Sequence, residues 1–231
     1  MTLDKTAIRD AATVIVLRGG ADDPHVLMGQ RGATAAFMPD KFVFPGGAVD
    51  PEDADVPLVS PLSILCQDRL CEDSRPGMAA ALAAATIREL WEEAGLIIGQ
   101  KGGWPGEVPP DWTTFAQRGY LPDASGLQFV FRAITPPGRP RRFDARFFLV
   151  DAMHLAGDPD DFSAACDELV HLQWIPLRDV RRFDLPFITE VVLAEIAARA
   201  GDPAPPASVP FYRNDDEQSL FLRLNGTSLP Q

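Results

Sequence analysis

The chain alternates short apolar runs with turns rich in glycine and proline, a pattern that predicts several strands and a few helices. Residues 12–17 are β-branched and apolar, end at an Arg-Gly-Gly turn and are followed by a second apolar run at 25–30, which predicts a hairpin. Residues 41–45 predict another short extended segment, closed by Gly46 and Gly47. Further strands are expected at 128–134, 146–150 and 168–175.

Two segments have the composition of helices. Residues 78–94 are rich in alanine, contain no internal glycine or proline, and stop at Gly95, a residue type that commonly caps a helix C-terminus. Residues 188–200 form a second candidate, which ends at Gly201. Because strands and helices do not alternate regularly, we expect an α+β or layered α/β domain.

Three stretches interrupt these elements. Four prolines break residues 50–77, where one apolar patch predicts a surface excursion with a short helix. Residues 99–110 hold several glycines and prolines and predict an irregular segment, and a proline-rich tail begins at about residue 203. We therefore expect a single domain over residues 1–231, with an inserted segment at about 54–77.

Charge and composition exclude several classes of function. With a net charge of −12, the chain lacks the clustered Lys and Arg of a nucleic-acid surface, so we expect no nucleic-acid partner. No apolar run approaches the roughly 20 residues that cross a bilayer, and residues 1–5 lead into no secretion signal, so we expect no membrane segment. The three cysteines form no Cys-x-x-Cys pair, which argues against a zinc site and favours a cytoplasmic location.

The segment 83–95 (AAATIRELWEEAG) places three carboxylates on one helical face. Glu89, Glu92 and Glu93 fall within an arc of about 100° on a helix that turns about 100° per residue. Like charges at this spacing repel each other, and the helix dipole disfavours anions in the last turns. A site for a dication such as Mg²⁺ accounts for both costs. A solvated acidic face is the alternative, and the helix alone leaves the two interpretations evenly balanced.

The glycine turn before that helix shifts the balance. Gly46 and Gly47 follow a short strand, and paired glycines let the backbone approach a ligand closely or expose a carbonyl to it. In isolation, a Gly-Gly pair is more often an ordinary tight turn. Combined with the sequence RELWEEAGL at 88–96, it favours a metal site built from helix carboxylates and the turn.

These residues resemble the Nudix box, whose pattern is G-x5-E-x7-R-E-U-x-E-E-x-G-U, with U an aliphatic residue. In the first half Gly47 matches, and Asp53 stands where the family has Glu. The second half of the pattern is matched at every specified position, namely Arg88, Glu89, Leu90, Glu92, Glu93, Gly95 and Leu96. Seven matched positions within nine residues make the resemblance specific.

The spacing inside the box differs from the family's. The family places seven residues between the early acidic position and the arginine, whereas residues 54–87 number thirty-four here, an insertion of twenty-seven. A box split in this way resembles a Nudix subgroup that includes coenzyme A diphosphatases of animals, as do residues 42–50 and 142–148. The resemblance covers about residues 13–197. It implies a layered α/β/α Nudix fold, a mixed curved sheet flanked by helices, with a helical or irregular insertion inside the box.

The resemblance also implies a metal-dependent hydrolase of the diphosphate bond in a nucleoside diphosphate linked to another group. Carried over by position, Glu89, Glu92 and Glu93 would hold Mg²⁺ or Mn²⁺ with the backbone carbonyl of Gly47. Glu89 would be a ligand or the general base, and the sequence leaves both roles open; Glu93 would join it among the catalytic residues. Arg88 would orient the carboxylates, which a structural salt bridge at i,i+4 would also do.

Residues outside the box give weaker indications. Asp167 or Glu168, at the start of a strand, could complete the metal or substrate site. Arg31, at the end of a strand that leads to the glycine turn, and Arg142, in an arginine-rich turn, could bind substrate phosphates. For each of them a solvated surface position is the simpler interpretation.

Coenzyme A or an acyl derivative is the substrate that the subgroup resemblance implies. ADP-ribose, dinucleoside polyphosphates and NADH are the enzymatic alternatives. A non-catalytic Nudix domain that senses a nucleotide is the alternative from another class, but such domains usually lose box glutamates, and all three are present here. We therefore expect a small-molecule nucleotide as partner, and the sequence leaves the oligomeric state open, a homodimer included.

Overall fold

A large mixed sheet forms the centre of the molecule. The computed structural model describes residues 7–33, 38–214 and 218–226, so the expectation for residues 1–5 lies outside it. The strands of the sheet are β1 (Ile8–Arg18), β2 (His25–Arg31), β3 (Phe42–Val43), β4 (Gly46–Ala48), β7 (Gln128–Ile134), β8 (Arg142–Asp151), β10 (Leu169–Pro176), β11 (Val209–Asn214) and β12 (Ser219–Leu224). Their order is β10-β2-β1-β8-β7-β11-β12, with β3 paired to β2 and β4 paired to β1.

Strand β1 organises this sheet. It forms the predicted antiparallel hairpin with β2 and runs parallel to β8, from the pair Ile8–Arg142 to the pair Leu17–Asp151. The pair β7–β11 is also parallel, whereas β7–β8, β2–β10 and β11–β12 are antiparallel. The sheet is therefore mixed, as the sequence predicts.

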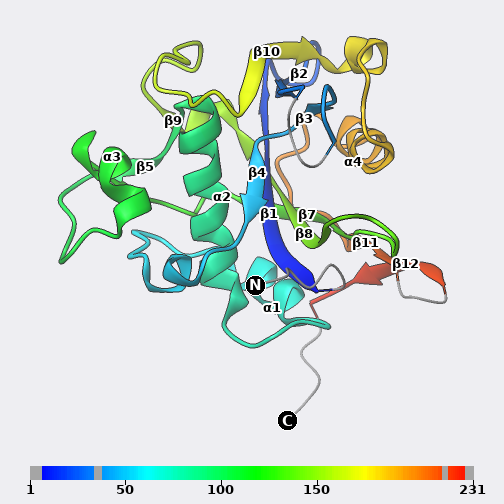
Figure 1. Ribbon diagram of the computed structural model, residues 1–231, viewed down its shortest axis with the longest axis horizontal. Coiled ribbons are helices and arrows are strands. Elements are labelled where there is room, and N and C mark those ends of the chain that lie inside the picture. The colour runs from blue at the N-terminus through cyan, green and yellow to red at the C-terminus, as the bar shows by residue number, and fades with distance from the viewer. Residues whose placement is uncertain (1–6, 34–37, 215–217, 227–231) are drawn as a thin grey trace.

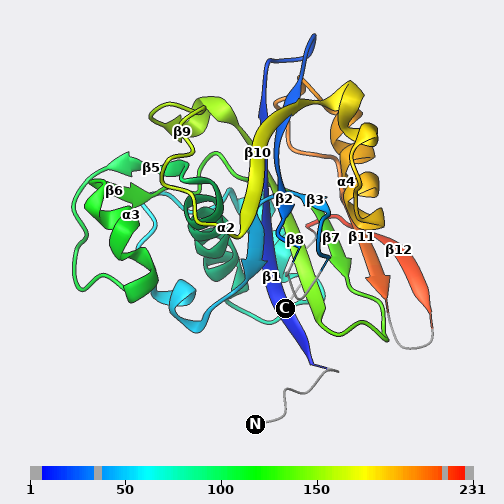
Figure 2. The same ribbon diagram turned by 45° about the horizontal axis from the view of Figure 1, so that its top comes forward.

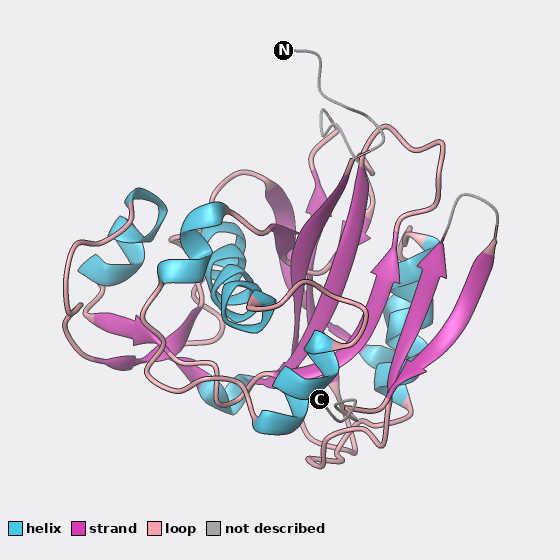
Figure 3. Cartoon of the chain, turned by 90° about the horizontal axis from the view of Figure 1, so that it is seen from below, coloured by secondary structure: helices cyan, strands magenta, loops and turns pink. Residues whose placement is uncertain are grey.

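Helices cover both faces of the sheet. They are α1 (Ile64–Cys71), α2 (Met78–Ala94), α3 (Thr113–Gln117) and α4 (Phe187–Ala197), with the short 3-10 helices η1 (Pro51–Asp55), η2 (Pro110–Trp112), η3 (Ala152–His154) and η4 (Leu177–Arg182). Helix α2 lies on one side of the sheet and α4 on the other (Figures 1 and 3). Since successive strand residues point to opposite faces, Val14 and Val16 of β1 join the core under α2, and Ile15 joins the core under α4. The expected α/β/α layering is confirmed.

Helix α2 begins and ends at the predicted residues. Its C-cap Gly95 has a φ of 70°, and the Gly95 N–H donates to the carbonyl of Trp91. A left-handed cap of this kind costs glycine little because it has no Cβ. The second predicted helix is shorter than expected: α4 ends at Ala197, before Gly201.

A small second sheet lies beyond α2, on the side away from the large sheet (Figure 2). It consists of β5 (Ile97–Lys101), β6 (Tyr120–Pro122) and β9 (Leu155–Ala156), in the order β6-β5-β9. The prediction of an irregular segment from residue 99 is therefore wrong at its start, because β5 continues to Lys101. Its pairing with β6 and β9 depends on residues far away in the sequence, which the local composition cannot reveal.

Two other predictions, for the insertion and for the proline-rich tail, are corrected by the structure. The insertion contains the expected short helix, α1, but it is not a surface excursion, since Leu62, Cys66 and Leu70 are buried in the core under α2. The proline-rich tail returns to the large sheet as β11 and β12. Within the described ranges, none of the helices combines the length and the apolarity needed to cross a membrane.

Candidate active site

The glycine turn lies directly against helix α2. In β4, Gly46 pairs with Thr13 and Gly47 with Ala12 of β1. A Cβ added to Gly47 would lie 2.4 Å from Oε1 of Glu89, and one added to Gly46 would lie 2.5 Å from the carbonyl oxygen of Ala12. Both distances are far below van der Waals contact. At Gly46 the obstacle is backbone, which excludes a side chain, and at Gly47 a side chain would displace the Glu89 carboxylate. The turn and the helix carboxylates, distant in sequence, form one site.

Glu93 is the most deeply buried of the three box glutamates, with 2% of its surface exposed. Its Oε2 accepts a hydrogen bond of 2.7 Å from the Gly46 N–H, whereas its Oε1 is buried without a partner among the described residues. Burial raises the pKa of Glu93 well above its ordinary value, and the neighbouring Glu89 raises it further. A buried carboxylate oxygen without a donor costs free energy unless a proton or a cation satisfies it.

Glu89 lies beside Glu93 and is almost as buried. Burial raises the pKa of Glu89 to about 7, against the opposing effect of the Arg88 guanidinium, and the charge of Glu92 adds to the increase. The Oε1 of Glu89 accepts a hydrogen bond of 2.9 Å from Nη1 of Arg88. A carboxyl group with a pKa near neutrality can gain or lose a proton at physiological pH.

Arg88 connects three elements of the site. Its Nε and Nη2 each donate to Asp53 of η1 at 3.0 Å, and Nη2 also donates to the carbonyl of Ala48 at the end of β4. Its Nη1 donates to Glu89 and, at 3.3 Å, to Glu92. Asp53, the acidic residue at the early box position, is 1% exposed. Its ion pair with Arg88 joins the two halves of the box, which the insertion separates in sequence.

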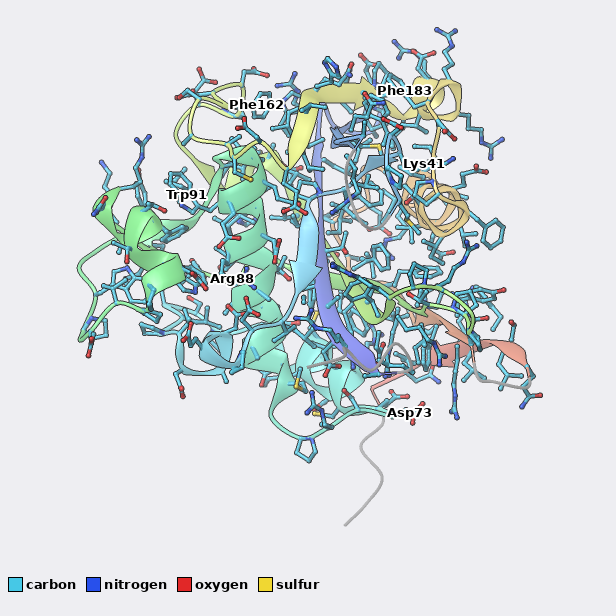
Figure 4. The ribbon with its side chains drawn as sticks, viewed as in Figure 1. Lys41, Asp73, Arg88, Trp91, Phe162 and Phe183 are labelled. Carbon is cyan, nitrogen blue, oxygen red and sulfur yellow. The ribbon has the colours of Figure 1, made fainter. Side chains whose placement is uncertain are left out.

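Glu92 is the most exposed of the three glutamates, with 36% of its side chain accessible. Burial still raises the pKa of Glu92, while Arg88 opposes the increase. The sequence places all three carboxylates on a face that points away from the core. The structure differs because β4 and η1 cover that face and bury Glu89 and Glu93. Figure 4 labels Arg88 on α2, and this residue is itself buried, with 4% of its surface exposed.

These residues fit a divalent cation as a partial set of ligands. The unpartnered Oε1 of Glu93 and the carboxyl of Glu89 lie against the Gly46–Gly47 backbone, which leaves oxygen atoms and little steric bulk at one place. Among the described residues, no three or more His, Cys, Asp or Glu side chains converge into a complete ion site. Magnesium does not need one, since it usually takes one or two protein carboxylates and completes its shell with water and phosphate oxygens.

Arg31 and Glu168 lie near the box. Arg31 ends β2, and its Nη2 donates to Oε1 of Glu168 at 2.7 Å, beside the pair that Arg31 forms with Leu169 of β10. The charge of Glu168 raises the pKa of both Glu89 and Glu93, and Arg31 lowers that of Glu93. The strand pairing therefore brings two of the three predicted substrate-binding residues to the carboxylates.

Arg142 lies elsewhere. It pairs with Ile8 along β1, four residues from Ala12, which corresponds to roughly 13 Å along the strand. It is 8% exposed and donates to the carbonyls of Thr135 and Asn214, so it connects the β7–β8 turn to β11. A substrate-binding role for Arg142 gains no support from this position.

A pocket that the sequence did not indicate adjoins the box. It has a volume of about 440 Å³ and lies between α2, α3 and the loop before β10, with Glu92 in its wall. Its other residues include Arg118 and Cys166, which belong to distant parts of the chain. No local pattern marks either residue, because the pocket exists only when those segments pack together.

The comparisons with known proteins find Nudix hydrolases similar to this chain in sequence and in fold. No family model matches the chain. The chain is 30% identical, over 179 residues, to the putative nudix hydrolase 7 of Caenorhabditis elegans, an alignment that covers 72% of this chain and 51% of that protein. It is 28% identical, over 205 residues, to the acyl-coenzyme A diphosphatase NUDT19 of Gallus gallus, with 61% of this chain and 54% of that protein covered. The chain thus spans about half the length of these curated relatives.

The solved structures agree. The crystal structure of a Nudix hydrolase from Alicyclobacillus acidocaldarius superposes with a TM-score of 0.63 at 30% sequence identity. The similarity covers 84% of this chain and 92% of that one. The α/β/α arrangement is therefore a Nudix fold.

Proposed function

The chain belongs to the Nudix hydrolase family, and we propose that it hydrolyses the diphosphate bond of a nucleoside diphosphate linked to another group. The observation that carries this proposal is the buried pair Glu89–Glu93 packed against the Gly46–Gly47 turn, with one carboxylate oxygen unpartnered. The distant similarity to an acyl-coenzyme A diphosphatase favours coenzyme A or an acyl derivative as the first substrate to test.

We assign Mg²⁺ or Mn²⁺ to the carboxylates of Glu92 and Glu93 and the carbonyl of Gly47, with Glu89 either as a further ligand or as the general base. A bound divalent cation neutralises charge on phosphate oxygens and activates water for attack on phosphorus. The orphaned Oε1 of Glu93 supports this assignment, because a cation would satisfy it. In an acidic chain, such a cation also reverses the local field that repels a diphosphate.

Glu89 is the best placed general base. A pKa of about 7 lets its carboxylate accept a proton from an attacking water at physiological pH. Arg88 positions it, since the guanidinium is itself held by Asp53 and the Ala48 carbonyl and so cannot swing away. Arg31, held by Glu168 next to the box, would meet a substrate phosphate as a planar guanidinium.

The test is a product-resolved screen of diphosphate substrates with Mg²⁺ or Mn²⁺. Coenzyme A, an acyl-coenzyme A, ADP-ribose, a dinucleoside polyphosphate and NADH are incubated separately, and nucleoside monophosphate products are quantified. The double variant Glu92→Gln with Glu93→Gln is expected to lose more than about a hundredfold in kcat/KM, or about 2.7 kcal/mol of transition-state stabilisation. The double variant Glu107→Gln with Glu190→Gln, which changes two exposed glutamates away from the box, should retain wild-type turnover.

Two outcomes would count against the proposal. Wild-type turnover in the Glu92→Gln, Glu93→Gln protein, with its circular dichroism unchanged, would show that the site assignment is wrong. Saturable binding of a nucleotide without any product, under either metal, would favour a nucleotide sensor instead.

A further inference from the structure

The pocket next to Glu92 is large enough to hold part of a substrate. Its volume of about 440 Å³ lies within the range of small-molecule sites. Trp91 and Glu92 of α2 form one wall, Thr114 and Gln117 of α3 with the adjoining Arg118 form another, and the loop before β10 forms the third. Because Glu92 belongs to both the pocket and the box, a ligand held at the box can extend directly into the pocket.

Arg118 is the cation of this pocket. Its side chain is exposed and makes no hydrogen bond or ion pair with any residue in the described ranges. Its guanidinium carbon lies 5.7 Å from the centroid of the Trp91 ring. Contact with an aromatic face restrains a guanidinium without occupying its N–H donors. Arg31 and Arg88, by contrast, are engaged by carboxylates.

The packing between α2 and α3 fixes the position of Arg118. The Trp91 Nε1–H donates to Oγ1 of Thr114 at 2.9 Å, and the Trp91 ring meets the buried ring of Phe115 edge to face at 6.0 Å. Figure 4 shows Trp91 on the side of α2 that faces α3. On the opposite wall, the Cys166 N–H donates to the carbonyl of Glu92 at 2.8 Å. Both walls of the pocket are thus attached to the helix that carries the box.

The charges around the pocket make Arg118 decisive for an anionic ligand. Glu92 lies in the wall, the charge of Asp111 acts on Glu92, and Asp161 is close enough for Arg118 to contribute to lowering its pKa, after the hydrogen bonds from Ser163. These carboxylates repel an anion, and Arg118 is the lining residue that attracts one. A planar guanidinium with free donors matches the oxygens of a phosphate group bidentately.

We propose that Arg118 is a specificity residue that binds a phosphate monoester carried by the substrate in addition to its diphosphate. This proposal rests on the proposed function and names the substrate class of the same site. The preferred substrate then has three phosphates in two separate places, two in the diphosphate at the box and one in the pocket. The third phosphate belongs either to the nucleoside half or to the other half of the substrate.

Calorimetric titration with product-like ligands tests this inference without relying on turnover. In the presence of Mg²⁺, adenosine 3′,5′-bisphosphate is compared with AMP for the nucleoside half. Glucose 1,6-bisphosphate is compared with glucose 1-phosphate for the other half. We expect the wild-type protein to bind the bisphosphate at least about tenfold more tightly in one of the two comparisons.

The variant Arg118→Gln should remove that preference while changing the affinity for the monophosphate less than twofold. The matched control Arg181→Gln changes an exposed arginine of η4, outside the pocket, and should keep the preference. The inference is overturned if the wild-type protein prefers neither bisphosphate, or if the preference persists in Arg118→Gln. Absence of diphosphate hydrolysis by the wild-type protein would instead count against the proposed function, because these titrations require no turnover.

Discussion

The molecule contains two clusters of charged side chains, which differ in how far positive groups of the protein neutralise their carboxylates. The first, here called the glutamate cluster, comprises Glu89, Glu92, Glu93, Asp53 and Arg88. In it, the buried Arg88 guanidinium pairs with Asp53, Glu89 and Glu92, whereas Glu93 lies beside Glu89 and accepts from the Gly46 N–H. Burial raises the pKa of each of the three glutamates, and one carboxylate oxygen has no partner.

The second, here called the arginine cluster, comprises Arg132 of β7, Asp144 and Arg146 of β8, and Asp10 of β1. Asp144 accepts from Nε and Nη2 of Arg132 at 2.9 and 2.7 Å, and Asp10 accepts from Arg146 at 2.6 Å. Burial raises the pKa of Asp10, but the nearby guanidinium groups outweigh this effect and lower it below its ordinary value. In this cluster each carboxylate is matched by a cation.

The difference is the one expected between a structural network and the metal site proposed for the box. The two arginines also donate to the carbonyls of Glu72 and Asp73 and to Oγ of Ser74, so the arginine cluster fastens the end of the insertion to the sheet. The glutamate cluster has surplus negative charge that the protein itself leaves uncompensated. A fold tolerates such a surplus where a cation is to be bound, because the binding free energy offsets the cost.

The largest expected effect on stability comes from unbalancing the arginine cluster. The variant Asp144→Asn removes the carboxylate between two buried guanidinium groups, which then repel each other, and it leaves Arg132 without a carboxylate partner among the described residues. Breaking a buried ion pair in this way costs about 3–5 kcal/mol. Urea unfolding should show that loss. The control Asp160→Asn breaks the exposed pair with Arg18 and should cost less than about 1 kcal/mol. Equal, small losses in both variants would mean that the arginine cluster does not stabilise the fold.

Local patterns in the sequence were sufficient for the helix of the site but not for its surroundings. The limits of α2 follow from its composition and from Gly95, and the box residues follow from their spacing within that helix. The contact of Gly46 with Glu93 joins residues 47 positions apart, so only the matched box pattern connected them in advance. The burial of Glu89 and Glu93 was not predicted, because β4 and η1, which cover them, are distant from α2 in the sequence.

The arginine cluster and the pocket were invisible in the sequence for a related reason. Asp10, Arg132 and Arg146 become neighbours through strand register, and an arginine in a strand looks like an ordinary surface residue. Through the same register, Arg142 lies buried at the start of β8, where it donates to the carbonyls of Thr135 and Asn214. A pattern in sequence predicts the face of an element, whereas these contacts depend on which elements become adjacent.

The two clusters should give stability of opposite dependence on pH in metal-free protein. Glu89 has a folded-state pKa of about 7 against an ordinary 4.5, so its stabilising contribution is complete below pH 4.5 and is lost as the pH rises to 7. The loss from this group is on the order of 2–3 kcal/mol. Asp10 has a lowered pKa, so its contribution is present above pH 3.8 and is lost as the pH falls through its folded-state value.

Urea unfolding in EDTA between about pH 2 and pH 8 measures both slopes. The variant Glu89→Gln should lose less stability between pH 4.5 and pH 7 than the wild-type protein, with Glu93 supplying what slope remains. The variant Asp10→Asn should weaken the loss of stability below pH 3.8 and leave the loss between pH 4.5 and pH 7 unchanged. A wild-type stability that rises between pH 5 and pH 7 would contradict the assignment of surplus charge to the glutamate cluster.

The smallest expected effect is a gain in stability from removing one charge of the glutamate cluster. In Glu93→Gln, the amide oxygen can still accept from the Gly46 N–H, and the repulsion with Glu89 disappears. At pH 8 without metal, this variant should be more stable than the wild-type protein by about 1 kcal/mol. Adding Mn²⁺ should reverse the order, since the wild-type carboxylate binds the cation and the amide does not, and binding stabilises by RT ln(1 + [L]/Kd). If Mn²⁺ raises the melting temperature of both proteins equally, the unpartnered oxygen of Glu93 is not a metal ligand, and the contrast between the two clusters then has another cause.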